Sequence, residues 1–180
     1  MYATIHPFTA PTDARSALAG GPDPVGTVVL ASPDGDGGTL LALWPDPDSA
    51  ARSGAARVYR VSDEMRGRAT GRRPMFAQVT WINGDGDRAR ADAAEHGGRD
   101  RIWPAVREID GIVEVLAMRS DDHRIVVVGL TTDRETHDRV QRAIMATPLL
   151  ADEDQAQLPG PDRVDLVRVL AADLPTAVGS

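Results

Sequence analysis

The chain has 180 residues and a formal net charge of −7, with 42% hydrophobic and 26% charged residues. These fractions are typical of a globular protein, and no apolar run reaches the ~18 residues of a membrane-spanning helix. The acidic balance argues against a nucleic-acid surface, because such binding depends on neutralising phosphates with a basic patch. We therefore expect neither a membrane nor a nucleic acid as a partner.

Two residue types are missing, and each absence removes a class of chemistry. Without cysteine the chain has no disulfide, thiolate nucleophile or cysteine-ligated metal. All 20 basic residues are arginine, so Schiff-base chemistry and a phosphate-binding Walker lysine are excluded as well. No basic region followed by an apolar stretch opens the chain, and we expect a cytoplasmic location.

The first third of the chain alternates short strands with short helices. Residues 2–8 alternate polar and apolar side chains, and a Gly/Asp-rich turn over 33–38 favours a hairpin, because it supplies residues that tolerate positive φ. The predicted elements are strands over 2–8, 25–31, 39–44 and 57–61 and helices over 13–19 and 46–53.

The rest of the chain repeats this order with longer elements. A helical stretch over 87–108 is interrupted near Gly97-Gly98 and at Pro104, and Thr132 with Glu135 forms the pattern of a capping box. The predicted elements are strands over 76–82, 111–117, 124–130 and 164–170 and helices over 87–108 and 132–147.

An internal repeat organises these elements. The polar and apolar pattern of residues 1–8 recurs in residues 75–82, and both halves then read β-α-β-β-α-β, the ferredoxin-like order. We predict an α+β fold of tandem ferredoxin-like repeats with antiparallel sheets, packed as a dimeric α/β-barrel-like unit. The predicted boundaries are a shortened repeat over 1–66, an Arg/Gly-rich linker over 67–74, a full repeat over 75–172 and a tail over 173–180.

Residues 75–170 resemble the dimeric α/β-barrel superfamily, particularly its antibiotic biosynthesis monooxygenase-like branch. The run from Ile102 to Gly111 resembles the family's helix ending in an Asp-Gly turn, and the passage from strand to helix at Thr132–His137 is similar too. Residues 1–62 resemble a shortened copy. The family pairs two such units into a barrel, so the resemblance implies that one chain builds what relatives build as a homodimer. A homodimer of this chain remains open.

The resemblance directs attention to Trp44, because many members carry a tryptophan at this strand end, before acidic residues and a helix of small residues. An indole here would stack on an aromatic ligand and donate its N–H. Packing in the core without a chemical role is the alternative interpretation.

Strand alternation groups the other polar candidates. Gln78 and Thr80 share one face of their strand and Trp81 lies on the other, whereas Asn83 is interpreted as a turn residue. Tyr2 and His6 share a face of the first strand. If that face is interior, His6 would act as a base or as a hydrogen-bond donor to a phenolic ligand.

The implied activity is a cofactor-independent oxygenation of a polycyclic phenol or quinone. In such chemistry the substrate carbanion reduces dioxygen, while the protein deprotonates, orients and excludes water. The alternative is a non-catalytic small-ligand-binding or accessory protein of the same fold, which the truncated first half and the single-copy Trp44 favour. The candidate residues are catalytic His6 and Gln78 and ligand-binding Tyr2, Trp44, Thr80, Trp81 and Trp103.

No cofactor and no metal are expected. The four histidines are too scattered for a metal-binding spacing. Haem-degrading relatives use a helical histidine some ten residues beyond the tryptophan, where this chain has Gly54. His137 lies on the corresponding helix of the second repeat and is expected to be a partly exposed surface residue.

Overall fold

The computed structural model describes residues 1–10, 14, 16–18, 21–35 and 37–175. It divides into two compact units, of which unit 1 comprises Met1–Arg60 with Val167–Ser180 and unit 2 comprises Val61–Leu166. Of the helix predicted over 13–19, residues 13, 15 and 19 lie outside the described residues, and residues 14 and 16–18 form turns and a bend. No helix in the described part of the chain is long and apolar enough to cross a membrane.

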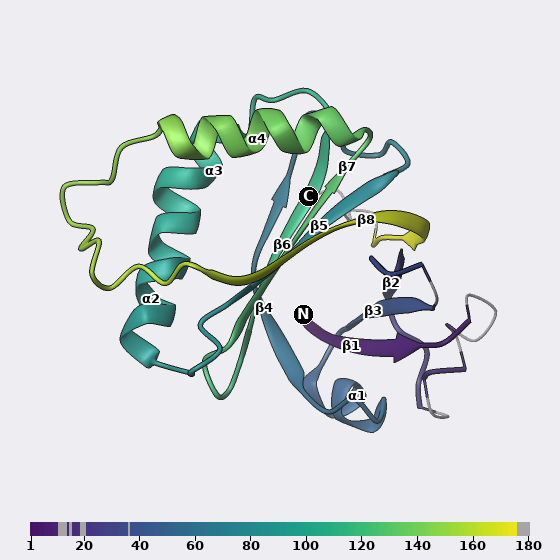
Figure 1. The fold of residues 1–180 in the computed structure, drawn as a ribbon. Helices are drawn as coiled ribbons and strands as arrows, with labels where there is room; N and C mark the ends of the chain where they lie inside the picture. Colours follow the sequence, from purple (N-terminus) through teal and green to yellow (C-terminus); the bar gives the residue numbers. More distant parts are fainter. Residues whose placement is uncertain (11–13, 15, 19–20, 36, 176–180) are drawn as a thin grey trace. The chain divides into compact units, whose positions relative to one another are not determined.

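Apart from the helix predicted over 13–19, the elements follow the predicted order (Figure 1). The first five are β1 (Tyr2–Phe8), β2 (Gly26–Ala31), β3 (Gly38–Trp44), α1 (Pro47–Arg52) and β4 (Val58–Arg66). The others are β5 (Phe76–Ile82), α2 (Arg88–Gly97), the π-helical segment η2 (Gly98–Ile102), α3 (Trp103–Val106), β6 (Ile112–Ser120), β7 (Ile125–Thr131), α4 (Arg134–Ala146) and β8 (Pro161–Asp173).

Each unit has the ferredoxin-like strand order. In unit 1 the neighbouring strands run β4-β1-β3-β2-β8, and in unit 2 they run β8-β5-β7-β6-β4, so β4 and β8 carry residues of both units. The paired strands with a defined register are antiparallel. The predicted α+β class and tandem ferredoxin-like topology are confirmed.

Aspartate side chains begin the helices that follow the hairpins. The Asp46 carboxylate accepts a hydrogen bond from the Ser49 amide at 2.8 Å, and the Asp133 carboxylate accepts one from the Thr136 amide at 2.8 Å. The predicted capping box at Thr132 is therefore wrong by one residue. A carboxylate accepts more strongly than a hydroxyl at the positive end of a helix, which favours Asp133.

The interruption predicted near Gly97-Gly98 is a change of helix type. The chain remains helical from Arg88 to Val106, but residues Gly98–Ile102 form the π-helical segment η2. Pro104 has no backbone N–H to give to the preceding turn, which explains why regular α-helical bonding fails just before it. This segment borders the site described below.

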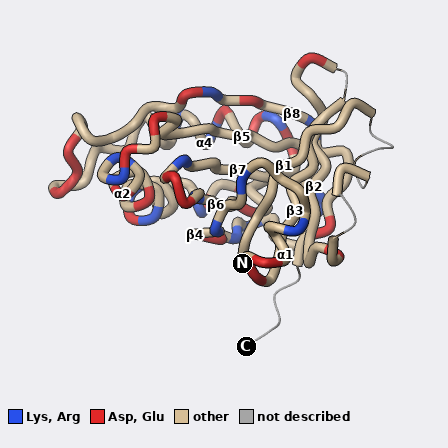
Figure 2. The backbone as a smooth tube through the Cα atoms, turned by 90° about the horizontal axis from the view of Figure 1, so that it is seen from below, with Lys and Arg blue, Asp and Glu red and all other residues tan. Residues whose placement is uncertain are grey.

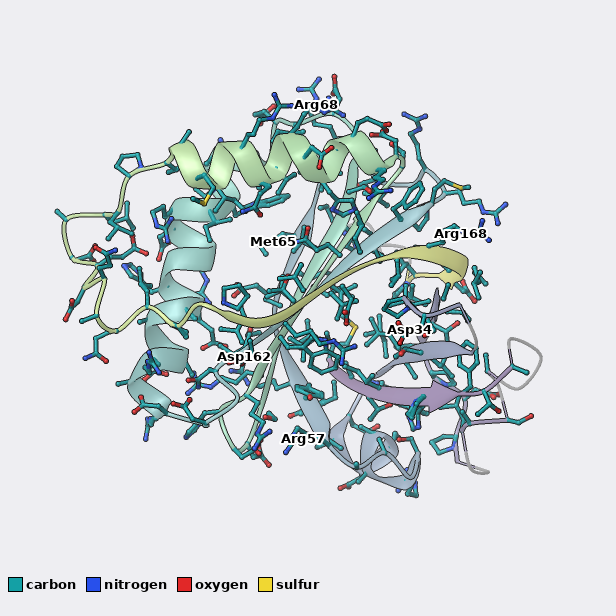
Figure 3. All side chains as sticks on the ribbon, in the orientation of Figure 1. Asp34, Arg57, Met65, Arg68, Asp162 and Arg168 are labelled. Carbon is teal, nitrogen blue, oxygen red and sulfur yellow. The ribbon has the colours of Figure 1, made fainter. Side chains whose placement is uncertain are left out.

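A buried ion pair joins the loop between α4 and β8 to the π-helical segment η2. Arg101 on η2 donates to the Glu153 carboxylate at 2.7 Å, and the side chains are only 10% and 1% exposed. The Leu150 amide donates to the same carboxylate. Farther along, the Gly84 amide donates to Asp162, labelled in Figure 3, which ties the start of β8 to the turn after β5.

Glu114 on β6 is a buried carboxyl group, 6% exposed. Burial raises its pKa from 4.5 to about 7, the negative charge of Glu64 adds to this increase, and the positive charge of Arg66 opposes it. The unfolded chain ionises this group more readily than the folded chain does. The contribution of Glu114 to the free energy of unfolding is therefore fully present below pH 4.5 and is lost as the pH rises toward 7.

We predict that Glu114→Gln stabilises the protein by about 3 kcal/mol at pH 8 and has little effect at pH 4, because glutamine cannot ionise. Urea unfolding at the two pH values measures this difference. The exposed Glu108→Gln is the control and should follow the wild type at both. Equal free energies of unfolding for Glu114→Gln and wild type at pH 8 would contradict the prediction.

Candidate ligand pocket in unit 2

A pocket of about 420 Å³ lies in unit 2 between the helix-facing side of the sheet and the helices that cover it. Figure 1 shows α2, α3 and α4 over this face. The volume falls within the ~300–1,000 Å³ that is typical of small-molecule sites. Its lining is mostly apolar and includes Met65, labelled in Figure 3, together with Ile82, Ile102, Trp103, Val106, Ile112, Val115, Ala117, Ile125, Val127, Val140, Ile144, Met145 and Val164.

The sheet contributes two of the predicted polar residues. Gln78 and Thr80 on β5 both line the pocket, as strand alternation predicted for one face. The Gln78 amide nitrogen lies 3.4 Å from the Thr80 hydroxyl, a long contact that leaves most of the amide's bonding capacity for a ligand.

The helices supply the apolar wall opposite. Trp103 and Val106 come from α3, and Val140, Ile144 and Met145 come from α4. The Met145 side chain is 76% exposed although it also lines the pocket, so it lies at the rim. Trp103, predicted as a ligand-binding residue, is part of this wall.

His137 lies at the Thr131 end of the pocket, and the expectation that it is partly exposed is wrong. It is buried, because the first turn of α4 faces the sheet, and its Nε2 lies 2.8 Å from the Thr131 hydroxyl oxygen. The Thr131 hydroxyl donates to the Asp133 carbonyl, so His137 Nε2 must be the donor in the shared bond. The Nδ1 atom is then left as a hydrogen-bond acceptor.

Burial also keeps His137 neutral. It lowers the pKa from 6.5 to about 4, with the negative charges of Asp133 and Asp138 opposing the shift. A neutral imidazole with a fixed tautomer can accept a hydrogen bond from a ligand hydroxyl.

The charged residues in the lining are paired. Asp63 on β4 accepts two hydrogen bonds from the Arg99 guanidinium, at 2.9 and 3.0 Å, and Glu95 accepts one from Arg119 at 2.8 Å. Figure 2 shows acidic and basic positions close together along α2. The pocket therefore offers its ligand neutral polar groups, without an isolated charge.

Three predicted site residues belong to unit 1, where a hydrogen-bonded chain joins two of them. Trp44 Nε1 donates to the Thr4 hydroxyl at 2.8 Å, and that hydroxyl lies 2.9 Å from His6 Nε2. Trp44 has no exposed surface and packs with Ala42 and Ala50, with Tyr2 against this cluster. Burial lowers the pKa of His6.

Trp81 and Asn83 lie outside the pocket lining. Trp81 is on the other face of β5 from Gln78, with the Arg163 guanidinium 5.7 Å from its ring centroid. Asn83 has a φ of 62°, and its amide donates to the carbonyls of Asp87 and His123. The interpretation of Asn83 as a turn residue is confirmed.

Equivalent register positions explain why unit 2 holds this space. In unit 1 Trp44 pairs with Tyr2, whereas in unit 2 Thr131 occupies that place and pairs with Phe76. A threonine fills much less volume than an indole. The sequence signal was present, because the tryptophan occurs in one repeat alone, but Thr131 and His137 were not predicted as pocket residues.

No protein-family model matches the sequence, and no curated protein matches it either. Solved structures do match. A heme-degrading enzyme from Listeria monocytogenes is 8% identical with a TM-score of 0.57, covering 93% of this chain and 99% of that one. An anthrone oxidase-like protein is 10% identical with a TM-score of 0.57, covering 99% and 96%.

A third solved structure also matches the chain. This ferredoxin-fold protein from Listeria monocytogenes, related to antibiotic biosynthesis monooxygenases, is 8% identical with a TM-score of 0.53, and the match covers 93% of both chains. The chain therefore has the fold of antibiotic biosynthesis monooxygenase-like proteins, as the sequence resemblance predicted. At these identities the likeness concerns the fold alone.

We predict that His137 makes the protein less stable in acid. Its pKa is lower in the folded state, so the unfolded chain takes up the proton first and stability falls as the pH drops from 6.5 toward 4. The His137→Gln variant lacks this proton uptake. Between pH 7 and pH 4.5 its free energy of unfolding should fall by roughly 2–3 kcal/mol less than that of the wild type. Urea unfolding of both proteins measures this, and parallel pH profiles would refute it.

Proposed function

We propose that the chain binds a small, uncharged and largely apolar molecule of the phenol or quinone class in the pocket of unit 2. The observation that carries this proposal is the composition of the lining, in which aliphatic and aromatic side chains surround a few polar groups. Such pockets gain affinity from apolar burial and orientation from a small number of hydrogen bonds. Gln78, Thr80 and His137 are the groups that would orient the ligand.

The polar groups suit neutral oxygen atoms. The Gln78 amide can donate to a quinone carbonyl or accept from a phenol hydroxyl, and His137 Nδ1 can accept from a hydroxyl. Because Asp63 and Glu95 are paired with Arg99 and Arg119, the lining has no spare cation for an anionic ligand. Haem, with two propionates, is for this reason not the proposed ligand.

Oxygenation of the bound molecule is the second candidate, and the fold shared with an anthrone oxidase-like protein favours it. In such a reaction an anthrone would lose a proton, and its carbanion would pass electrons to dioxygen. One oxygen atom would become the new carbonyl and the other would leave as water. Gln78 would orient the substrate, and the apolar wall would exclude solvent.

The strength of the available base makes binding the first candidate. A histidine whose pKa lies near 4 holds a proton weakly, so His137 is a poor acceptor for the proton of a phenol or anthrone. The catalytic role predicted for His6, and the ligand-binding roles of Tyr2, Trp44 and Trp81, stay predictions outside this pocket.

We predict that 1,8-dihydroxyanthraquinone binds at one site and quenches Trp103. Gln78→Leu keeps the side-chain size and removes the hydrogen bond to the ligand, so its Kd should rise roughly threefold to tenfold, the range of one neutral hydrogen bond. Calorimetric titration measures the Kd, and Trp103→Phe identifies the quenched residue. The exposed Gln155→Leu is the matched control and should bind as wild type does.

Turnover is tested separately with anthrone in air-saturated buffer, by following anthraquinone absorbance above the uncatalysed rate. Binding without turnover would support the binding function and would contradict oxygenation of anthrone. Absence of binding across a panel of neutral polycyclic phenols and quinones would overturn the proposed function, as would tight binding of hemin in their place.

A further inference from the structure

Gly129 lies in the middle of β7, on the face that lines the pocket. Its antiparallel neighbours in the sheet are Gln78 on β5 and Val115 on β6, and both line the same pocket. The position therefore faces the covering helices from the centre of the sheet, beside the amide group that we propose orients the ligand.

The space above Gly129 is open. A Cβ atom built on this residue would have no neighbouring atom within 4 Å. In the core of a protein, where side chains are closely packed, such a vacancy on an internal strand is unusual. Glycine also weakens a strand interior, and it is often found where a ligand or another backbone must approach closely.

Unit 1 shows how the same register position is filled when no such space is left. There Ala42 on β3 pairs with Thr4 on β1, as Gly129 pairs with Gln78 in unit 2. Ala42 has no exposed surface and packs in the cluster of Trp44 and Ala50. The fold therefore accommodates a methyl group at this position, and glycine is not required by the backbone.

We propose that Gly129 is a ligand-contacting residue that sets how closely a flat ring approaches the sheet. With no side chain there, the ring of the ligand lies against the β7 backbone and places its edge oxygen at the Gln78 amide. This inference rests on the proposed binding function and adds the face of the pocket on which the ligand lies.

The proposal separates ligand binding from folding. A methyl group on Gly129 would meet no protein atom, so it costs the fold no steric strain, and alanine lowers the entropy of the unfolded chain relative to glycine. The same methyl group would occupy the place of the ring and would push the ligand away from Gln78. Gly129→Ala should therefore fold as well as the wild type and bind less tightly.

The experiment compares Gly129→Ala with Gly160→Ala in the full chain. A Cβ at the exposed Gly160 also meets no atom within 4 Å, and this residue does not line the pocket. We expect both variants to keep the wild-type Tm or to raise it by up to about 4 °C. The Kd for 1,8-dihydroxyanthraquinone should rise at least tenfold in Gly129→Ala and stay unchanged in Gly160→Ala.

The outcomes distinguish this inference from the function on which it rests. If the wild type binds the probe and Gly129→Ala binds it equally well, the inference is wrong and the binding function stands. A large drop in Tm for Gly129→Ala would show that the space is not open, and it would also overturn the inference. If the wild type does not bind, both proposals fail together.

Discussion

Each ferredoxin-like sheet must bury its helix-facing side, and the volume of the side chains on that side decides whether burial is complete. In unit 1 Trp44 and Ala42 occupy two successive positions on the helix-facing side of β3, and the short helix α1 covers them. In unit 2 the same register positions carry Thr131 and Gly129. The longer helix α4 then spans a sheet surface with less side-chain volume, and a pocket remains.

A pocket on a sheet face exposes polar groups to a low-dielectric space, so their hydrogen bonding decides what can bind. Thr131 fixes the tautomer of His137, and the paired Asp63 and Arg99 leave no unbalanced charge. An unpaired charge in the lining would have destabilised the folded protein through its desolvation, and it would have favoured a ligand of opposite charge. The neutral groups that remain suit the neutral ligand that we propose.

Shared fold and shared function are different claims for this protein. The matches to a heme-degrading enzyme and to an anthrone oxidase-like protein concern the fold alone, and one fold can host unrelated functions. The choice among them depends on particular side chains. Here our proposal of neutral-ligand binding depends on Gln78 and on the weakly basic His137.

Apart from the helix predicted over 13–19, the sequence by itself determined the elements, their ferredoxin-like order and the face of β5 that carries Gln78 and Thr80. These features depend on local periodicity, turn chemistry and helix caps, which a chain displays without its tertiary contacts. It also showed that Trp44 has no counterpart in the second repeat.

Only the tertiary structure decided where that difference creates space. Whether His137 is buried, whether Arg99 meets Asp63, and whether the surface above Gly129 is empty all depend on side chains that are distant in sequence. Packing density is a property of all the neighbours of a site together. No spacing in the sequence therefore distinguishes Ala42, which lies in a filled core, from Gly129, which lies on the floor of a pocket.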